Sequence, residues 1–104
     1  MVEILQATTP TFILTVPNSV DLTTVRNLCF SLKQNNNVLI NKFIDALTVE
    51  SHTVSVFLTQ IETLKLSAGQ AKIQLNWLWP NGTRGGTYEV TITILENLLK
   101  EVMT

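Results

Sequence analysis

Apolar and polar residues alternate with a period of two over most of this chain, which is the pattern of β-strands with one buried face. The clearest stretch is 71–95, where Pro80-Asn81-Gly82 separates two alternating runs. The apolar positions of the first run are Ile73, Leu75, Trp77 and Trp79. Those of the second run are Tyr88, Val90, Ile92 and Ile94. We predict a long β-hairpin at the centre of the core, with its turn at the Asn-Gly pair.

Shorter alternating runs predict further strands at 4–8, 11–16, 25–34, 38–43, 46–50 and 53–58. The strands at 25–34 and 38–43 are joined by three asparagines, 35–37, and asparagine tolerates the positive φ of tight turns. Together the runs predict an all-β fold, an immunoglobulin-like β-sandwich of about seven or eight strands. A small barrel is the alternative. With 104 residues, the chain is expected to form one domain, 1–104.

Two segments break the alternation. Thr59 followed three residues later by Glu62 is a capping box, which predicts a short helical turn over 60–64. In the segment 96–103, apolar residues stand at 98, 99, 102 and 103, a spacing that fits a short C-terminal helix or an arm. A helix of this length is not stable alone, so the segment needs either the core or a partner.

Charged residues make up only 14% of the chain, against about 25% in typical domains. The net charge is −1 and no basic stripe is present, which argues against a nucleic-acid partner. No apolar run reaches the roughly 18 residues of a membrane span, and the N-terminal residues predict no secretion signal. An uncharged surface loses water at lower cost than a charged one, so the composition favours contact with neighbouring subunits. High β-propensity of threonine is the competing explanation.

Residues that could carry catalysis or bind a cofactor are scarce. His52 is the single histidine and is expected to be a solvated turn residue, while Cys29 is the single cysteine and is expected to be an inert buried thiol. Gly85-Gly86 lacks the lysine of a phosphate loop and predicts a bulge or bend. We therefore predict no enzyme, no cofactor, no metal and no small-molecule substrate.

Two groups of residues are candidates for binding. Trp77 and Trp79 share one strand face; core packing is the first interpretation, and stacking on sugars is the alternative. The candidate subunit contacts are apolar residues near the two ends and the arginine at the hairpin tip: Ile4, Leu5, Arg84, Leu98, Leu99, Val102 and Met103.

Several short motifs carry a family resemblance, and they extend over most of the chain: Thr9-Pro10-Thr11-Phe12, Val16-Pro17, Asp21-Leu22, Thr53-Val54-Ser55-Val56, Leu58-Thr59-Gln60, Glu62-Thr63-Leu64, Ile73-Gln74-x-x-Trp77 and Glu96-Asn97-Leu98-Leu99-Lys100. They resemble a family of small stand-alone proteins from phages and prophages of Gram-positive bacteria. Ile61 departs from the family pattern, which often has an acidic residue there, and so favours burial of this turn.

The resemblance implies a virion structural protein: a head decoration, a neck or head–tail component, or a baseplate component. Its partners would be other virion proteins and copies of itself, and it would reside in the virion after assembly in the host cytoplasm. It brings no catalytic residues. The alternative function is a carbohydrate-binding β-sandwich that contacts host surface glycans through Trp77 or Trp79.

Overall fold

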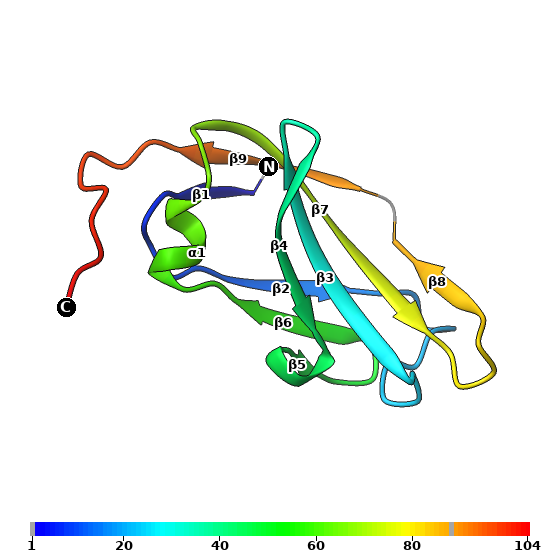
Figure 1. Ribbon diagram of the computed structural model, residues 1–104. Helices are drawn as coiled ribbons and strands as arrows, with labels where there is room; N and C mark the ends of the chain where they lie inside the picture. Colours follow the sequence, from blue (N-terminus) through cyan, green and yellow to red (C-terminus); the bar gives the residue numbers. More distant parts are fainter. Residues whose placement is uncertain (1, 88) are drawn as a thin grey trace.

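Nine strands in two sheets form the part of the chain that this computed structural model describes, residues 2–87 and 89–104 (Figure 1). The larger sheet has the order β1-β9-β7-β3-β4, with β8 beside β7, and the smaller sheet has the order β2-β6-β5. The strands are β1 Glu3–Leu5, β2 Thr11–Thr15, β3 Asn27–Gln34, β4 Asn37–Phe43, β5 Thr48–Val49, β6 Thr53–Phe57, β7 Gly69–Leu78, β8 Arg84–Gly86 and β9 Val90–Leu95. A 3₁₀ turn, Ile44–Ala46, and one α-helix, α1 Gln60–Leu64, complete the elements.

The connectivity is that of an immunoglobulin-like sandwich. The chain crosses repeatedly between the sheets, and all pairings are antiparallel except that of β1 with β9, which is parallel. In immunoglobulin terms, β2, β6 and β5 take the places of strands B, E and D, while β4, β3, β7 and β9 take those of C′, C, F and G. The predicted all-β sandwich is confirmed.

The core forms between the two sheets because neighbouring strands bury the same parity of residues. In the register of β3 with β7, Leu28 lies opposite Trp77, and Phe30 lies opposite Leu75. All four of these side chains are buried. Phe12 of β2 closes the core from the smaller sheet, with its ring centroid 6.0 Å from that of Phe30.

The long hairpin is present, but its return strand is interrupted. β7 pairs first with β8 near the turn and then with β9, and neither Thr87 nor Glu89 belongs to a strand. The predicted burial of Ile92 and Ile94 is confirmed, whereas Val90 is 47% exposed. The expected inward position of Tyr88 lies outside the described residues. Gly82 takes the positive φ that the turn requires, 88°.

Three buried polar side chains fix the end of the sandwich at which α1 lies (Figure 1). Gln34 donates to the carbonyl of Ser67 at 2.7 Å and accepts from its N–H at 2.8 Å, which holds the loop between α1 and β7. Gln6 donates to the carbonyl of Leu66 at 2.6 Å, and Thr63 donates to that of Thr8 at 2.8 Å. Because buried polar groups must be paired, these side chains fix the loops that they contact.

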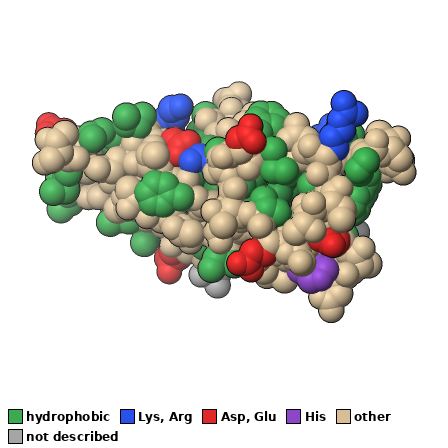
Figure 2. Space-filling view, turned by 90° about the horizontal axis from the view of Figure 1, so that it is seen from below, with side chains coloured by type: hydrophobic (Ala, Val, Ile, Leu, Met, Phe, Trp, Pro, Cys, Tyr) green, Lys and Arg blue, Asp and Glu red, His purple; other side chains and the backbone are tan. Residues whose placement is uncertain are grey.

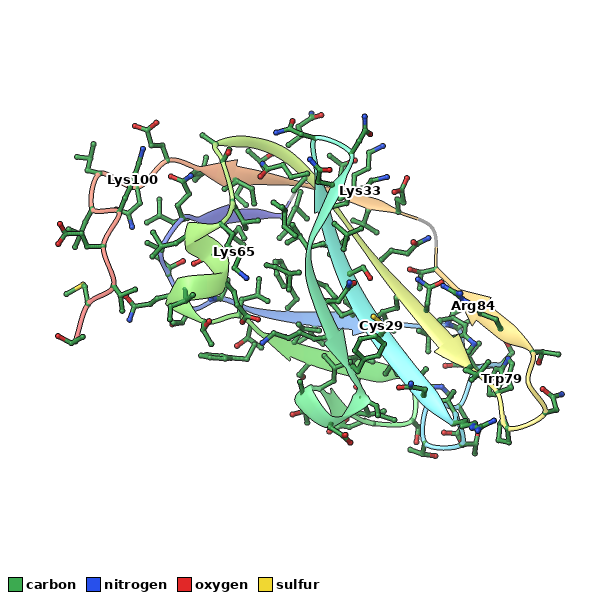
Figure 3. All side chains as sticks on the ribbon, viewed as in Figure 1. Cys29, Lys33, Lys65, Trp79, Arg84 and Lys100 are labelled. Carbon is green, nitrogen blue, oxygen red and sulfur yellow. The ribbon has the colours of Figure 1, made fainter. Side chains whose placement is uncertain are left out.

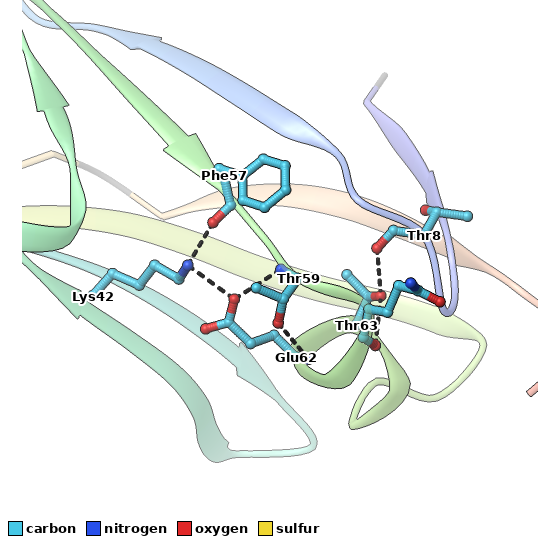
Figure 4. Close-up of polar contacts among 7 residues, drawn as sticks. Thr8, Lys42, Phe57, Thr59, Glu62 and Thr63 are labelled. Carbon is cyan, nitrogen blue, oxygen red and sulfur yellow. Dashed lines mark hydrogen bonds and ion pairs between the residues drawn. The ribbon is translucent and has the colours of Figure 1, made fainter. Parts of the chain in front are cut away.

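The capping box predicted at 59–62 is confirmed and extends into a link between the sheets (Figure 4). The Glu62 N–H donates to the Thr59 hydroxyl at 3.2 Å, and the Glu62 carboxylate accepts from the Thr59 N–H at 2.9 Å. Lys42, on β4 of the larger sheet, places its Nζ 2.9 Å from the same carboxylate and also donates to the carbonyl of Phe57 on the smaller sheet. One lysine thus connects β4, β6 and α1.

The Glu62 carboxyl should make stability depend on pH. Burial raises its pKa, but hydrogen bonds from Lys42 and Thr59 outweigh burial and hold the pKa below its usual value. The unfolded-state pKa is about 4.3, so this contribution is complete above that pH and is lost as the pH falls through the lower folded-state value. We expect Glu62→Gln to lower the free energy of unfolding at pH 7 by about 1 kcal/mol.

The measurement is urea denaturation of both proteins between pH 7 and pH 3. The difference between wild type and Glu62→Gln should shrink as the pH falls below about 4.3. Lys42→Met, which keeps most of the apolar stem, should weaken the same pH dependence. A constant difference between wild type and Glu62→Gln at every pH would contradict this assignment.

Candidate interaction surfaces

The C-terminal segment, residues 96–104, is an arm without helix or strand (Figure 1). At its root, the Asn97 side chain donates to the carbonyl of Gln6 at 2.8 Å, and the Asn97 N–H donates to the Gln6 side chain at 3.2 Å. Near its tip, the backbone of Met103 exchanges hydrogen bonds with the Gln60 side chain of α1, at 2.8 and 3.1 Å. The arm is therefore held at two points along the end of the sandwich.

The helical alternative for this segment is wrong, and the arm alternative is confirmed. Side chains form hydrogen bonds with backbone groups that would otherwise bond to each other within a helix. The Leu99 N–H donates to the side chain of Asn97 at 3.1 Å, and both backbone groups of Met103 bind Gln60. Asparagine competes with helical hydrogen bonding in this way, and a nine-residue segment has little helical stability to resist it.

Apolar side chains of the arm are turned to solvent. Leu98 is 96% exposed and Met103 is 68% exposed, while Leu99 and Val102 are 46% and 43% exposed. The space-filling view shows apolar side chains gathered at this end of the molecule (Figure 2). The radius of gyration is 14.3 Å, above the roughly 13 Å expected of a compact domain of this size. The four predicted C-terminal contact residues are thus all displayed.

The two N-terminal candidates have different surroundings. Ile4 is only 6% exposed and belongs to the chain's own core, so its prediction as a subunit contact is wrong. Parallel pairing places Ile4 opposite Ile94, a core residue of β9, and this explains its burial. Leu5, the next residue along β1, points away from the core and is 39% exposed.

The tryptophan pair does not form a stacking surface. Trp77 is 6% exposed and Trp79 is half-buried against the core, with the two ring centroids 6.5 Å apart in an edge-to-face arrangement. Trp77 therefore packs in the core, as the first interpretation predicted. Its buried ring is not available to stack on a sugar. Its indole Nε1 is buried and has no hydrogen-bond partner among the described residues.

The position of the Trp77 indole explains one glycine. Gly85 lies opposite Trp77 in the pairing of β7 with β8, and a Cβ there would lie 2.3 Å from the indole Nε1. Only a residue without a side chain lets the ring lie across the neighbouring strand. Gly85 and Gly86 are regular members of β8, and the interruption of the return strand begins after them.

Sequence reasoning missed a groove of about 410 Å³ on the outer face of the larger sheet. Its floor consists of small residues in neighbouring strands, and Phe43, 54% exposed, lies beside it. The Ser31 hydroxyl donates to the Asn41 side chain at 2.6 Å within this groove. The lining residues are uncharged apart from Arg84: Asn27, Leu28, Cys29, Ser31, Asn41, Phe43, Asn76, Trp77, Leu78 and Arg84. The visible signal was the run of small polar residues on the outward positions of 27–31.

Charges on this face are arranged unevenly (Figure 3). Toward one end, Glu89 lies 2.8 Å from Lys33 and 3.8 Å from Lys72, and the Lys33 hydrogen bond lowers the pKa of the Glu89 carboxyl. Toward the hairpin end, Arg84 is exposed and makes no ion pair within the described ranges. The exposed Arg84 guanidinium can donate hydrogen bonds to a carboxylate or a carbonyl of another chain, and its role as a subunit contact stays a prediction.

The single histidine and cysteine are placed differently from expectation. His52 is half-buried, not solvated, and its Nδ1 lies 2.7 Å from the carbonyl of Val20, so it holds the loop after β2. Cys29 is half-buried on the outer face and lines the groove, so it is not a core thiol.

Among the residues described, no three His, Cys, Asp or Glu side chains are grouped to hold a metal ion. No helix in the same ranges is long and apolar enough to cross a membrane.

The close approach of the Trp77 indole to Gly85 can be tested by adding a methyl group at position 85. Gly85→Ala should lower the free energy of unfolding by about 1–3 kcal/mol, because the added methyl overpacks the site. In a Trp77→Leu background the same change should cost clearly less, since the indole that it meets is gone. Thermal or urea unfolding of the four proteins measures this coupling. Equal costs in both backgrounds would show that the indole is not what excludes a side chain at position 85.

Comparison of the chain with protein-family models and with curated proteins finds no match. The phage resemblance read from the short motifs therefore stays a prediction.

Proposed function

We propose that this protein is a structural component of a phage particle, and that it works by binding other protein subunits through its C-terminal arm. The observation that carries the proposal is the display of Leu98, Leu99, Val102 and Met103 on a segment outside the core. The link to a phage particle comes from the sequence resemblance alone.

The energetics of the arm favour a protein partner. Burying an exposed leucine or methionine side chain contributes about 1.5–3 kcal/mol. Four such side chains on a preformed arm offer a large gain on association, and the arm is already restrained by hydrogen bonds to Gln6 and Gln60. Restraint before binding reduces the conformational entropy that binding must remove.

The rest of the surface supports the same class of function. Much of it is uncharged, so a neighbouring subunit could cover it without burying unpaired charged side chains. Partners would include other particle proteins and copies of this chain. Head decoration, neck or head–tail, and baseplate positions all remain within the proposal.

The carbohydrate-binding alternative has less support. It required an exposed face on Trp77 or Trp79. Trp77 lies in the core, and Trp79 is half-buried against it. Although the outer groove offers amide and hydroxyl groups, it was not the surface on which that alternative rested.

The arm can be tested by replacing its apolar side chains. A variant carrying Leu98→Ser, Leu99→Ser, Val102→Thr and Met103→Gln should fold normally, because these side chains lie outside the core. We expect its incorporation into particles of the encoding phage to fall at least about tenfold, which corresponds to about 1.4 kcal/mol of lost binding. Quantitative mass spectrometry of purified particles gives the ratio of this protein to the major particle protein.

A matched control removes exposed apolar side chains elsewhere, with Val38→Thr and Val90→Thr, which are 54% and 47% exposed in the parent. This control should incorporate normally. Limited proteolysis adds a second measurement: the arm should be cleaved in the free protein and protected in particles. Absence of the wild-type protein from particles would refute the proposed function, and normal incorporation of the arm variant would refute the role of the arm.

A further inference from the structure

Strand β2 leaves one row of backbone groups unpaired. It lies at an edge of the smaller sheet and, within residues 2–87 and 89–104, pairs only with β6. The flanking hydrogen bonds fix the direction of the groups: the Leu58 N–H donates to the carbonyl of Pro10 at 3.0 Å, and the Val16 N–H donates to the carbonyl of His52 at 2.9 Å. Because bonded pairs alternate along an antiparallel ladder, the even-numbered residues face β6. The N–H and C=O groups of Thr11, Ile13 and Thr15 therefore point to the open edge.

This edge lacks the features that usually prevent strands from pairing with other chains. β2 has no charged residue and no internal proline, and its pairing with β6 has no bulge. The other outer strands are different: β1 has three residues including Glu3, β8 has three residues including Arg84, β5 has two residues, and β4 carries Lys42. An unprotected five-residue edge is a ready template for a further strand.

The described residues also leave space beside β2. A cavity of about 100 Å³ lies along this side between the sheets, lined by Leu14 and Thr15 of β2 and by residues of the interrupted hairpin. Ile13, on the outer face of the same strand, is 70% exposed. Among the described residues, no strand occupies the position next to β2.

The sequence of β2 is symmetric about its central residue, which identifies the partner that fits. Thr11 and Thr15 are identical, and both Phe12 and Leu14 are large and apolar. In a second copy running antiparallel, Ile13 would lie opposite Ile13, and Thr11 opposite Thr15. All three opposed pairs then use outward-pointing backbone groups, so each pair exchanges two hydrogen bonds. The Phe12 and Leu14 side chains would extend the apolar inner face from one copy into the other.

Charge does not oppose this arrangement. The outward-facing side chains of the smaller sheet are hydroxyl or apolar groups, so a two-fold axis at Ile13 would bring no like charges together. The outward-facing residues are Thr11, Ile13, Thr15, Thr48, Thr53, Ser55 and Phe57.

We infer that β2 is a self-association edge, through which two copies of this chain pair around a two-fold axis at Ile13 and form one continuous six-stranded sheet. The inference adds a specific partner to the proposed function and involves a surface separate from the arm. The interface is small, so the dimer is weak in dilute solution. Fixed positions in a particle would raise the effective concentration and make the pairing persistent.

Hydrogen exchange of the full-length protein at low and high concentration tests the edge directly. The amides of Thr11, Ile13 and Thr15 have no acceptor among the described residues, so they should exchange rapidly at about 10 μM and become at least about fivefold slower near 1 mM, as the pairing forms. The amides of Phe12 and Leu14 should be protected at both concentrations. Sedimentation velocity over the same range should show a monomer–dimer equilibrium.

Ile13→Lys places two like charges opposite each other in the dimer and should abolish both the slowing and the dimer. Protected Phe12 and Leu14 amides would show that the variant is folded. Val38→Lys is the matched control, since it adds the same charge at a 54% exposed valine on β4, and it should dimerise normally.

The arm variant separates this inference from the proposed function. It should still dimerise through β2, whatever its incorporation into particles. A protein whose edge amides exchange rapidly at every concentration would overturn the inference, and so would a dimer that Ile13→Lys leaves intact. Loss of the dimer in the arm variant alone would assign self-association to the arm instead.

Discussion

The register of β3 with β7 is the constraint on which the rest of this sandwich depends. It sets Leu28 opposite Trp77 and Phe30 opposite Leu75, so the buried side chains of the two strands share one face. A shift of one residue would turn every one of these side chains to solvent. The same register places Cys29 opposite Asn76 on the outer face, so the core and the polar groove are two consequences of one pairing.

The end of the sandwich near α1 depends on polar contacts, and these also determine where the arm lies. Gln6 bonds to the loop after α1 and to Asn97 at the root of the arm. Lys42 joins the edge of the larger sheet to Glu62 and the smaller sheet. These contacts bind backbone groups where the sheets end, and the same contacts hold the root of the arm at Gln6. Leu98 and its neighbours lie outside the core, so their side chains are displayed along this end.

Local signals in the sequence were sufficient for most of the fold. Alternation placed the strands, Asn35 and Asn36 adopt the positive φ expected of their turn, and Thr59 with Glu62 forms the capping box. The failures involve contacts distant in sequence. Burial of Ile4 depends on parallel pairing with β9, and the open groove depends on which small side chains neighbouring strands bring together. Ile61 was expected to favour burial of its turn but is 62% exposed, because a helix as short as Gln60–Leu64 has one face to bury and Thr63 takes it.

The C-terminal arm and the open edge of β2 would have different roles in an assembly. Apolar side chains on the arm bind through area, which tolerates many orientations of a partner. The open edge of β2 binds through backbone hydrogen bonds, whose direction and spacing allow one geometry. An arm alone would hold subunits together without fixing their orientation, and a short edge alone would fix an orientation too weakly to last. A subunit with both can be captured by the first surface and aligned by the second, which is the requirement for building a symmetric particle.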